Sequence, residues 1–189
     1  MHESTSPSPW VVRWAHLLRP GSTVLDVACG RGRHVRWLAE RGLQVTGVDR
    51  DAAALEPLRA VAEVIVADIE TGEWPCAGRR FDAVLVTNYL WRPLGPTLLD
   101  CVVPGGLYIH ETFAAGNETV GRPSRADFLL KPGELLSNCA DWRVIAYEDG
   151  FAQAPDRFIQ RIVAARLAGS TATRAAPVWP LAGQPPGAG

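Results

Sequence analysis

The chain has 189 residues, of which 47% are hydrophobic and 21% are charged, and its formal net charge is -1. This length and composition are typical of one globular domain that buries a core of its own. Proteins that bind nucleic acid or anionic membranes through their overall charge carry a strong basic excess, which this chain lacks.

The N-terminal sequence MHESTSPSPW has no basic region followed by an apolar stretch, so we expect no signal peptide. No run approaches the roughly 20 apolar residues that a membrane span needs. The four cysteines are scattered, with no CxxC pair and no histidine at zinc-ligand spacing. We therefore expect free thiols in a reducing cytoplasm and no metal.

The chain divides into two tails and one domain. Residues 1–7 are expected to be disordered, residues 8–168 to form the domain, and residues 169–189 to be a disordered tail. The C-terminal tail is rich in Gly, Ala, Pro, Ser and Thr and cannot bury enough surface to fold alone. We therefore expect that removing residues 170–189 leaves thermal stability and cofactor affinity unaltered.

Strand-like and helix-like patterns alternate inside the domain. Residues 10–18, WVVRWAHLL, have helical spacing and are expected to pack on the domain, the alternative being a lid over a ligand. The expected strands are 23–29, 44–49, 63–69, 81–88, 106–113, 142–150 and 157–168. The further expected helices are 34–42, 52–62, 96–103 and 132–140. This alternation predicts an α/β fold, with a doubly wound, mostly parallel, seven-stranded sheet covered by helices on both faces.

The first strand ends in an acid- and glycine-containing loop, VLDVACGRGRH, at residues 24–34. Gly30 and Gly32 let the backbone bend and approach a ligand closely, and the helix that follows points free N–H groups at the same place. The third glycine of a dinucleotide fingerprint is missing, because Val35 stands there, and the phosphate-loop pattern is absent. Asp26, four residues before Gly30, favours a cationic ligand group over a pyrophosphate.

Acids also end the second and third strands. Asp49 can accept hydrogen bonds from both hydroxyls of a ribose, a feature shared by NAD-binding and nucleoside-binding folds. Asp68 can accept from an adenine amino group while Ile69 packs on the ring. The alternatives are a helix cap for Asp49 and a turn residue for Asp68. Asn88 follows the fourth strand, where it is a ligand contact or a turn residue.

The pattern D-x-x-x-G-x-G, followed by acids after strands two and three and by PGG at 104–106, resembles the class I S-adenosylmethionine-dependent methyltransferases over roughly residues 20–168. The resemblance implies a Rossmann-like methyltransferase fold and S-adenosylmethionine as cofactor. It also implies a set of cofactor-binding residues: Asp26, Ala28, Gly30, Gly32, His34, Asp49, Arg50, Asp68, Ile69, Asn88 and Tyr89.

The C-terminal part of the domain is similar to the tellurite-resistance-type methyltransferases. The similarity lies in LLKPGELLSNCADWRVIAYEDG and FIQRIVAARLA, and Arg161 matches that family's arginine in the last strand. The family's histidine–arginine pair before this strand has no match, since Ala152, Gln153 and Ala154 occupy the region. This departure puts tellurite or selenite in doubt as the substrate and leaves methyl transfer untouched.

Catalytic candidates gather after strands four and five and in the last strand: Tyr89, His110, Glu111 and Arg161. His110 and Glu111 point to opposite faces of a regular strand, so only one of them faces the ligand. A buried structural role for His110 is the alternative. Residues 114–128 form a long polar segment that suits a substrate lid or a solvated loop. Asn117, Arg122 and Arg125 are candidate contacts within it for an anionic or polar substrate.

The residues N-Y-L-W at 88–91 lack the proline that amino-methylating enzymes of nucleic acids carry after strand four. We therefore expect a small-molecule acceptor, such as a thiol, a metalloid oxyanion or a metabolite, with no nucleic acid or membrane as partner. Either a monomer or a homodimer is compatible with the sequence. Two alternatives stay open: an NAD-dependent oxidoreductase, which Val35 and the lack of a Tyr-x-x-x-Lys pair weaken, and a non-catalytic cofactor-binding protein.

Overall fold

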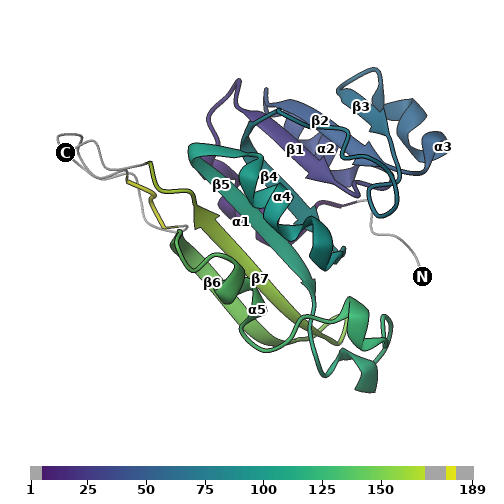
Figure 1. Ribbon diagram of the computed structural model, residues 1–189, viewed down its shortest axis with the longest axis vertical. Coiled ribbons are helices and arrows are strands. Elements are labelled where there is room, and N and C mark those ends of the chain that lie inside the picture. Colours follow the sequence, from purple (N-terminus) through teal and green to yellow (C-terminus); the bar gives the residue numbers. More distant parts are fainter. Residues whose placement is uncertain (1–5, 169–177, 182–189) are drawn as a thin grey trace.

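The computed structural model describes residues 6–168 and 178–181. A seven-stranded sheet in the order β3-β2-β1-β4-β5-β7-β6 runs through the molecule (Figure 1). Strands β1 to β5 pair in parallel, and β7 is antiparallel to both of its neighbours. The strands are β1 (Thr23–Val27), β2 (Gln44–Asp49), β3 (Glu63–Val66), β4 (Phe81–Thr87), β5 (Val102–Phe113), β6 (Arg143–Ala152) and β7 (Arg157–Ala165).

Helices cover both faces of this sheet, which confirms the predicted fold class. The α-helices are α1 (Pro9–Trp14), α2 (Arg33–Ala39), α3 (Ala52–Leu55), α4 (Gly95–Asp100) and α5 (Glu134–Asn138). Short 3-10 turns are η1 (Ala15–Leu17), η2 (Glu56–Leu58), η3 (Arg92–Leu94), η4 (Asn117–Thr119) and η5 (Ala126–Phe128). Helices α1, α2 and α3 share one core cluster, and α4 and α5 share the other, in front of the sheet in Figure 1.

The alternation of side chains along each strand divides the core between the two faces. In β1, Val24 faces the cluster of α1 to α3, whereas Leu25 and Val27 face the cluster of α4 and α5. Asp26 therefore lies on the α1 side of the sheet. The strand order reverses between β1 and β4, which places the crevice for a ligand at the carboxyl ends of these central strands.

Several expected boundaries were wrong for local reasons. The helix expected at 52–62 is an α-helix only to Leu55, because Pro57 cannot donate the next helical hydrogen bond and the chain continues as η2. The strand expected at 63–69 ends at Val66, before the turn that Asp68 closes. Strand β5 begins at Val102, so the expected helix 96–103 is shorter, and a register shift lies between β4 residues Phe81 and Ala83.

The segments expected to be disordered, 1–7 and 169–189, fall mostly outside the described residues. Within the C-terminal one, residues 178–181 are described. Trp179 packs against the core cluster that contains Trp14, and the Pro180 carbonyl lies 3.0 Å from His16 Nε2. These contacts reverse the expectation that loss of the tail leaves stability unaltered.

Trp179→Ala should therefore lower the free energy of unfolding by about 1 kcal/mol, because a partly buried aromatic ring leaves the core surface. Val178→Ala is the matched control, since Val178 is 85% exposed and its loss should change nothing. Thermal melts of both variants test the contact. Equal melting temperatures for the two variants would mean that Trp179 contributes nothing to stability.

Candidate functional site

In the loop after β1, three alternate residues have positive φ angles, in the left-handed region of backbone conformation. Ala28, Gly30 and Gly32 have φ angles of 52°, 54° and 70°. A Cβ at Gly30 would meet no atom within 4 Å, whereas a Cβ at Gly32 would overlap the buried side chain of Leu58. Gly30 thus faces open space in which a ligand could approach the backbone, and Gly32 lets helix α2 pack closely on η2.

Asp26 lies beneath this loop and is completely buried, with a relative exposure of 0%. Neither oxygen of its carboxyl group has a hydrogen-bond partner among the described residues. Burial raises the pKa of Asp26 to about 8, opposed by the charge of Arg33 and reinforced by Asp49. An unpartnered buried carboxyl group is costly, and a cationic ligand group would stabilise its ionised form.

His34, at the start of α2, is the buried neighbour of Asp26. Its Nε2 atom accepts a hydrogen bond from the backbone N–H of Ser8 at 3.0 Å, so the proton of the neutral ring is on Nδ1. Nδ1 lies 3.9 Å from Asp26 Oδ2 and 3.5 Å from Thr87 Oγ1. Burial and the nearby Arg33 lower the pKa of His34 to about 3. The contact between His34 and Asp26 is therefore between two groups that are largely neutral at pH 7.

Ser8 joins this pair to the end of β5, a link that the sequence analysis missed. The Ser8 hydroxyl donates to Glu111 Oε1 at 2.7 Å and accepts from Trp10 N as the N-cap of α1. Glu111 Oε2 accepts from Arg161 at 3.1 Å, and Arg161 also pairs with Glu148 at 2.8 Å. The pattern Ser-Pro at a helix start was the available signal, because serine is favoured as N-cap and proline at the first helical position.

Asp49, at the end of β2, contacts the same loop from the other side. Its Oδ2 accepts from the backbone N–H of Gly30 at 2.7 Å, and its Oδ1 accepts from that of Asp51 at 3.0 Å. Each carboxylate oxygen keeps a lone pair for a further donor. The helix-cap role falls to Asp51, whose side chain accepts from Ala54 N at the start of α3. Arg50, between the two acids, is exposed.

Asp68 is an exposed turn residue in this structure, which was the alternative role considered for it. Its carboxylate accepts from the backbone N–H groups of Glu70 and Thr71 and from the Thr71 hydroxyl. These hydrogen bonds lower the pKa of Asp68. The neighbouring Ile69 is partly buried against the core cluster of α4 and α5.

The residues after β4 are held in place by β5. Asn88 has a φ of 54° and its backbone N–H donates to Glu111 O at 2.8 Å. His110 donates from Nε2 to the Tyr89 carbonyl at 3.1 Å and accepts from the Tyr108 hydroxyl at 2.8 Å on Nδ1. Burial lowers the pKa of His110 to about 4. With both ring nitrogens engaged, His110 has a structural role, as the alternative held, and is not a free catalytic base.

His110 and Glu111 lie on opposite faces of β5, as predicted. The Tyr108 ring next to His110 belongs to the cluster of α4 and α5, whereas Ser8, the partner of Glu111, precedes α1. The four catalytic candidates are thus not brought together at one point, because Glu111 and Arg161 lie under α1. Asn117, a candidate contact in the expected lid, is 1% exposed and bonds to Pro123 O and Phe158 N, so its role is structural.

A pocket of ≈ 140 Å³ opens beside Tyr89, at the carboxyl ends of β4 and β5. The Tyr89 hydroxyl is buried and has no hydrogen bond of good geometry. Of its lining residues, the sequence predicted Asn88 and Tyr89 individually, and Pro123 and Phe128 lie in the segment 114–128 that was expected as a substrate lid or a solvated loop. The full lining is Glu70, Asn88, Tyr89, Leu90, Thr112, Phe113, Pro123 and Phe128.

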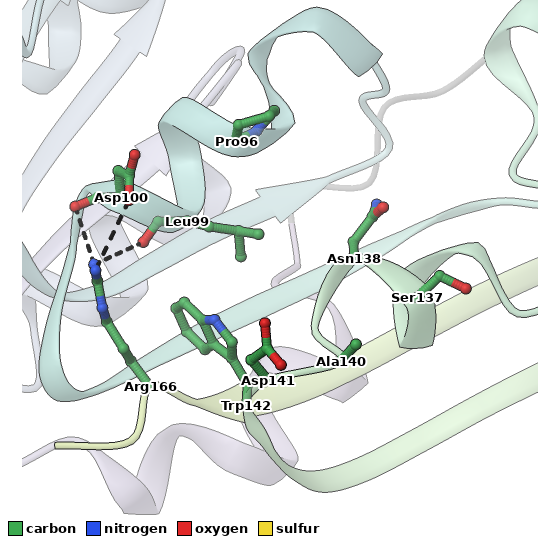
Figure 2. A pocket seen from close by; sticks show the side chains of 9 residues that line it. All are labelled: Pro96, Leu99, Asp100, Ser137, Asn138, Ala140, Asp141, Trp142 and Arg166. Carbon is green, nitrogen blue, oxygen red and sulfur yellow. Dashed lines mark hydrogen bonds and ion pairs between the residues drawn. The ribbon is translucent and has the colours of Figure 1, made fainter. Parts of the chain in front are cut away.

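A larger hollow of ≈ 290 Å³ lies between the ends of α4 and α5, near the start of β5 (Figure 2). It is bordered by Trp142 and Arg166, and the Arg166 Nη1 atom donates to the carbonyls of Leu99, Asp100 and Val102. This guanidinium caps the carboxyl end of α4. The hollow is at the amino ends of the parallel strands, so it is not where the loop residues converge.

Among residues 6–168 and 178–181, no cluster of three or more His, Cys, Asp or Glu side chains suits a metal ion. Over the same residues, no helix has the length and apolar character needed to cross a membrane.

Comparison with known proteins gives a family match for the part of the chain that starts in β1 and ends in β5. The family described as "Methyltransferase domain" matches residues 24–105. A ubiquinone biosynthesis O-methyltransferase of Alkalilimnicola ehrlichii is 32% identical over 49% of this chain and 42% of its own. A malonyl-[acyl-carrier protein] O-methyltransferase of Pseudescherichia vulneris is 30% identical over 71% of this chain and 62% of its own. The chain thus spans less than two thirds of the length of either relative.

Solved structures agree on the fold. TehB from Haemophilus influenzae superposes with a TM-score of 0.74 at 19% identity, covering 87% of this chain and 64% of the other. A TehB-like S-adenosylmethionine-dependent methyltransferase from Corynebacterium glutamicum gives a TM-score of 0.60 at 17% identity, covering 80% and 84%. At these identities the likeness concerns the fold alone, and TehB and a TehB-like protein are among the structures that share it.

Proposed function

We propose that this chain is a class I S-adenosylmethionine-dependent methyltransferase, which binds S-adenosylmethionine at the carboxyl ends of β1, β2 and β4 and methylates a small molecule. The methyltransferase-domain match over residues 24–105 and the fold of the solved structures support this proposal. The observation that carries the proposal is the buried, unpartnered carboxyl group of Asp26, four residues before the open backbone position of Gly30. A cationic amino-acid end of the cofactor supplies the missing partner of that carboxyl group.

Different residues around the loop bind different parts of the cofactor. Asp26 and the backbone of the loop from Ala28 to Gly32 hold the methionine end, and His34 fixes the loop through its contact with Ser8. Asp49 accepts from the ribose hydroxyls with the lone pairs that Gly30 and Asp51 leave free.

The residues after β3 and β4 complete the proposed cofactor site. Ile69 packs on the adenine, and Asp68 accepts from its amino group in addition to closing its turn. Arg50 lies beside the ribose side of this site. Asn88 and Tyr89 flank the reacting end of the cofactor.

The bound cofactor supplies an activated methyl group on a sulfonium. The protein's own part is to exclude water and to align the acceptor with the S–CH3 bond. Tyr89 lines the space where an acceptor would lie, and His110 fixes the backbone of Tyr89. Glu111 and Arg161 are positioning residues that hold the Ser8 segment over His34.

Thiols, metalloid oxyanions and metabolites were the acceptors considered from the sequence. We also propose a cytoplasmic location, which the four free, buried cysteines favour, and a monomer or homodimer without nucleic acid as substrate.

Calorimetric titration with S-adenosylmethionine, S-adenosylhomocysteine and NAD tests the proposed cofactor. We expect micromolar binding of the sulfonium compound or of its thioether product and no binding of NAD. Binding of NAD alone would instead favour the oxidoreductase alternative.

Asp49→Ala should weaken cofactor binding by about 2 kcal/mol, roughly thirtyfold, since the ribose hydroxyls lose a charged acceptor. Asp51→Ala is the matched control: it removes the exposed cap of α3 and should leave affinity unchanged. The two dissociation constants are measured by calorimetry. Unchanged affinity in a folded Asp49 variant would remove Asp49 from the site.

A further inference from the structure

The pocket beside Tyr89 has a lining that selects among acceptors. We propose that it takes a neutral or cationic organic molecule with one ring-sized apolar group, such as an arylalkyl amine or thiol, in preference to an oxyanion or a carboxylate. This inference rests on the proposed function, because it names the acceptor class of the same site.

The size and the apolar walls of the pocket argue for a ring-sized group. Its volume is ≈ 140 Å³, and a cavity of about 150 Å³ in another protein holds one benzene molecule. Leu90, Phe113, Pro123 and Phe128 supply apolar or aromatic surface. A dry apolar wall of this kind stabilises a hydrocarbon group and strips water from a charged anion at a cost.

The polar groups of the lining argue against an anion. Glu70 is the one charged residue in the lining, and its carboxylate would repel an anionic acceptor. Burial, followed by the negative charges of Glu70 and Asp68, raises the pKa of Tyr89 far more than the charge of Arg50 lowers it. The Tyr89 hydroxyl therefore stays protonated at neutral pH, and it lies close to the Glu70 carboxylate.

Two arginines near the pocket, Arg92 and Arg125, are engaged in contacts with the segment that forms one of its walls. Arg92 bonds through all three of its guanidinium nitrogens, to the Glu134 carboxylate and to the carbonyls of Asp127 and Leu129. Arg125 pairs with Asp127 at 3.0 Å and lies over the Phe128 ring. These arginines fix the segment that carries Phe128, so their charges are paired within the protein and are not free to bind an anionic acceptor.

Methyl transfer to an acceptor in this pocket needs no reactant other than the cofactor and the acceptor. A cationic amine or a thiol first loses a proton to the Glu70 carboxylate at the pocket or to solvent, which frees a lone pair on nitrogen or sulfur. This lone pair forms the bond to the methyl carbon, and the electron pair of the S–CH3 bond stays on the cofactor sulfur, which leaves as a neutral thioether.

The test measures binding of four probes to the protein saturated with S-adenosylhomocysteine: phenethylamine, benzyl mercaptan, phenylacetate and selenite. Phenylacetate has the ring of the first two probes and the opposite charge to the amine. We expect the amine and the thiol to bind at least tenfold more tightly than phenylacetate or selenite. Equal or tighter binding of either anion, or no binding by any probe, would overturn the inference.

Substitutions of lining residues test whether this pocket causes the selectivity among the probes. Glu70→Gln should weaken phenethylamine about threefold to tenfold and leave benzyl mercaptan unchanged, with Glu73→Gln as the control for an exposed acid nearby. Phe128→Ala should weaken both, whereas Phe151→Ala, which removes a ring of similar exposure on β6, should weaken neither. Equal effects of the pocket and control variants would also overturn the inference.

The failure of this inference differs from the failure of the proposed function. If S-adenosylhomocysteine does not bind, the cofactor assignment fails and the acceptor class fails with it. If S-adenosylhomocysteine binds and selenite is the preferred probe, methyl transfer stands and only the acceptor class is wrong.

Discussion

Asp26→Asn is expected to weaken binding of S-adenosylmethionine about a hundredfold, which corresponds to about 3 kcal/mol. The carboxyl group is completely buried, lacks any hydrogen-bond partner among the described residues and lies beneath the glycine loop. When the cationic end of the cofactor binds there, the pair is shielded from water, so removing one charge leaves the other unpaired. The amide of asparagine keeps the shape of the carboxyl group and isolates the effect of its charge.

The same substitution should change how stability depends on pH. The pKa of Asp26 is raised from 3.8 to about 8 by burial in the cofactor-free protein. A folded-state pKa above the unfolded value means that the stabilising contribution is complete below pH 4. This contribution is lost as the pH rises to about 8. Asp26→Asn should lack this loss, which chemical denaturation at pH 5 and pH 8 would measure.

Cofactor binding should also release a proton. At pH 6.5 the Asp26 carboxyl group, with a pKa of about 8, is mostly protonated, and it ionises when it pairs with a cation. Calorimetry in two buffers of different ionisation enthalpy should show release of about one proton for the wild type and none for Asp26→Asn. Asp51→Asn is the control for loss of an exposed acid near the loop. Equal proton release by wild type and Asp26→Asn would contradict the role given to Asp26.

The second large effect separates the two glycines of the loop. Gly30→Ala should weaken cofactor binding at least tenfold, because its new methyl group enters the open space in which the proposed cofactor approaches the loop. Its cost in stability should be about 1 kcal/mol, since alanine must adopt a φ of 54°. Gly32→Ala should instead destabilise the fold by about 3 kcal/mol, because its methyl group overlaps the buried side chain of Leu58 in addition to the strain.

Each glycine variant is the control for the other, because both introduce the same methyl group at a left-handed position two residues apart. Thermal melts and cofactor titrations give a melting temperature and a dissociation constant for each variant. The expected pattern is a binding defect for Gly30→Ala and a stability defect for Gly32→Ala. The reverse pattern, or equal defects in both, would show that the open face of Gly30 is not where the cofactor lies.

The sheet and the edge at which its parallel strands end could be predicted because they depend on local patterns. Apolar runs that end before the glycines at 30 and 32, at Asp49 and before the N-Y pair at 88–89 mark strand ends, and parallel strands bring those ends to one edge. The strand boundaries were less predictable. The early start of β5 at Val102 depends on pairing with Phe81 in β4, which is a contact between distant parts of the sequence.

The roles of the catalytic candidates could not be predicted from their residue types. The alternation of β5 correctly separated His110 from Glu111. Whether His110 or Glu111 is free to face the acceptor depends on hydrogen-bond partners from other parts of the chain. Tyr108 and the Tyr89 carbonyl bind His110, and Ser8 binds Glu111. Such contacts arise only when the segments before α1 and after β4 meet at the end of β5.

The most direct test of the account is a crystal structure of the protein with S-adenosylhomocysteine. We expect its amino group within hydrogen-bond distance of the Asp26 carboxylate and its ribose hydroxyls on Asp49. We also expect its sulfur to face the pocket beside Tyr89. A thioether bound elsewhere, such as in the hollow between α4 and α5, or a site that leaves Asp26 without a partner, would contradict the account.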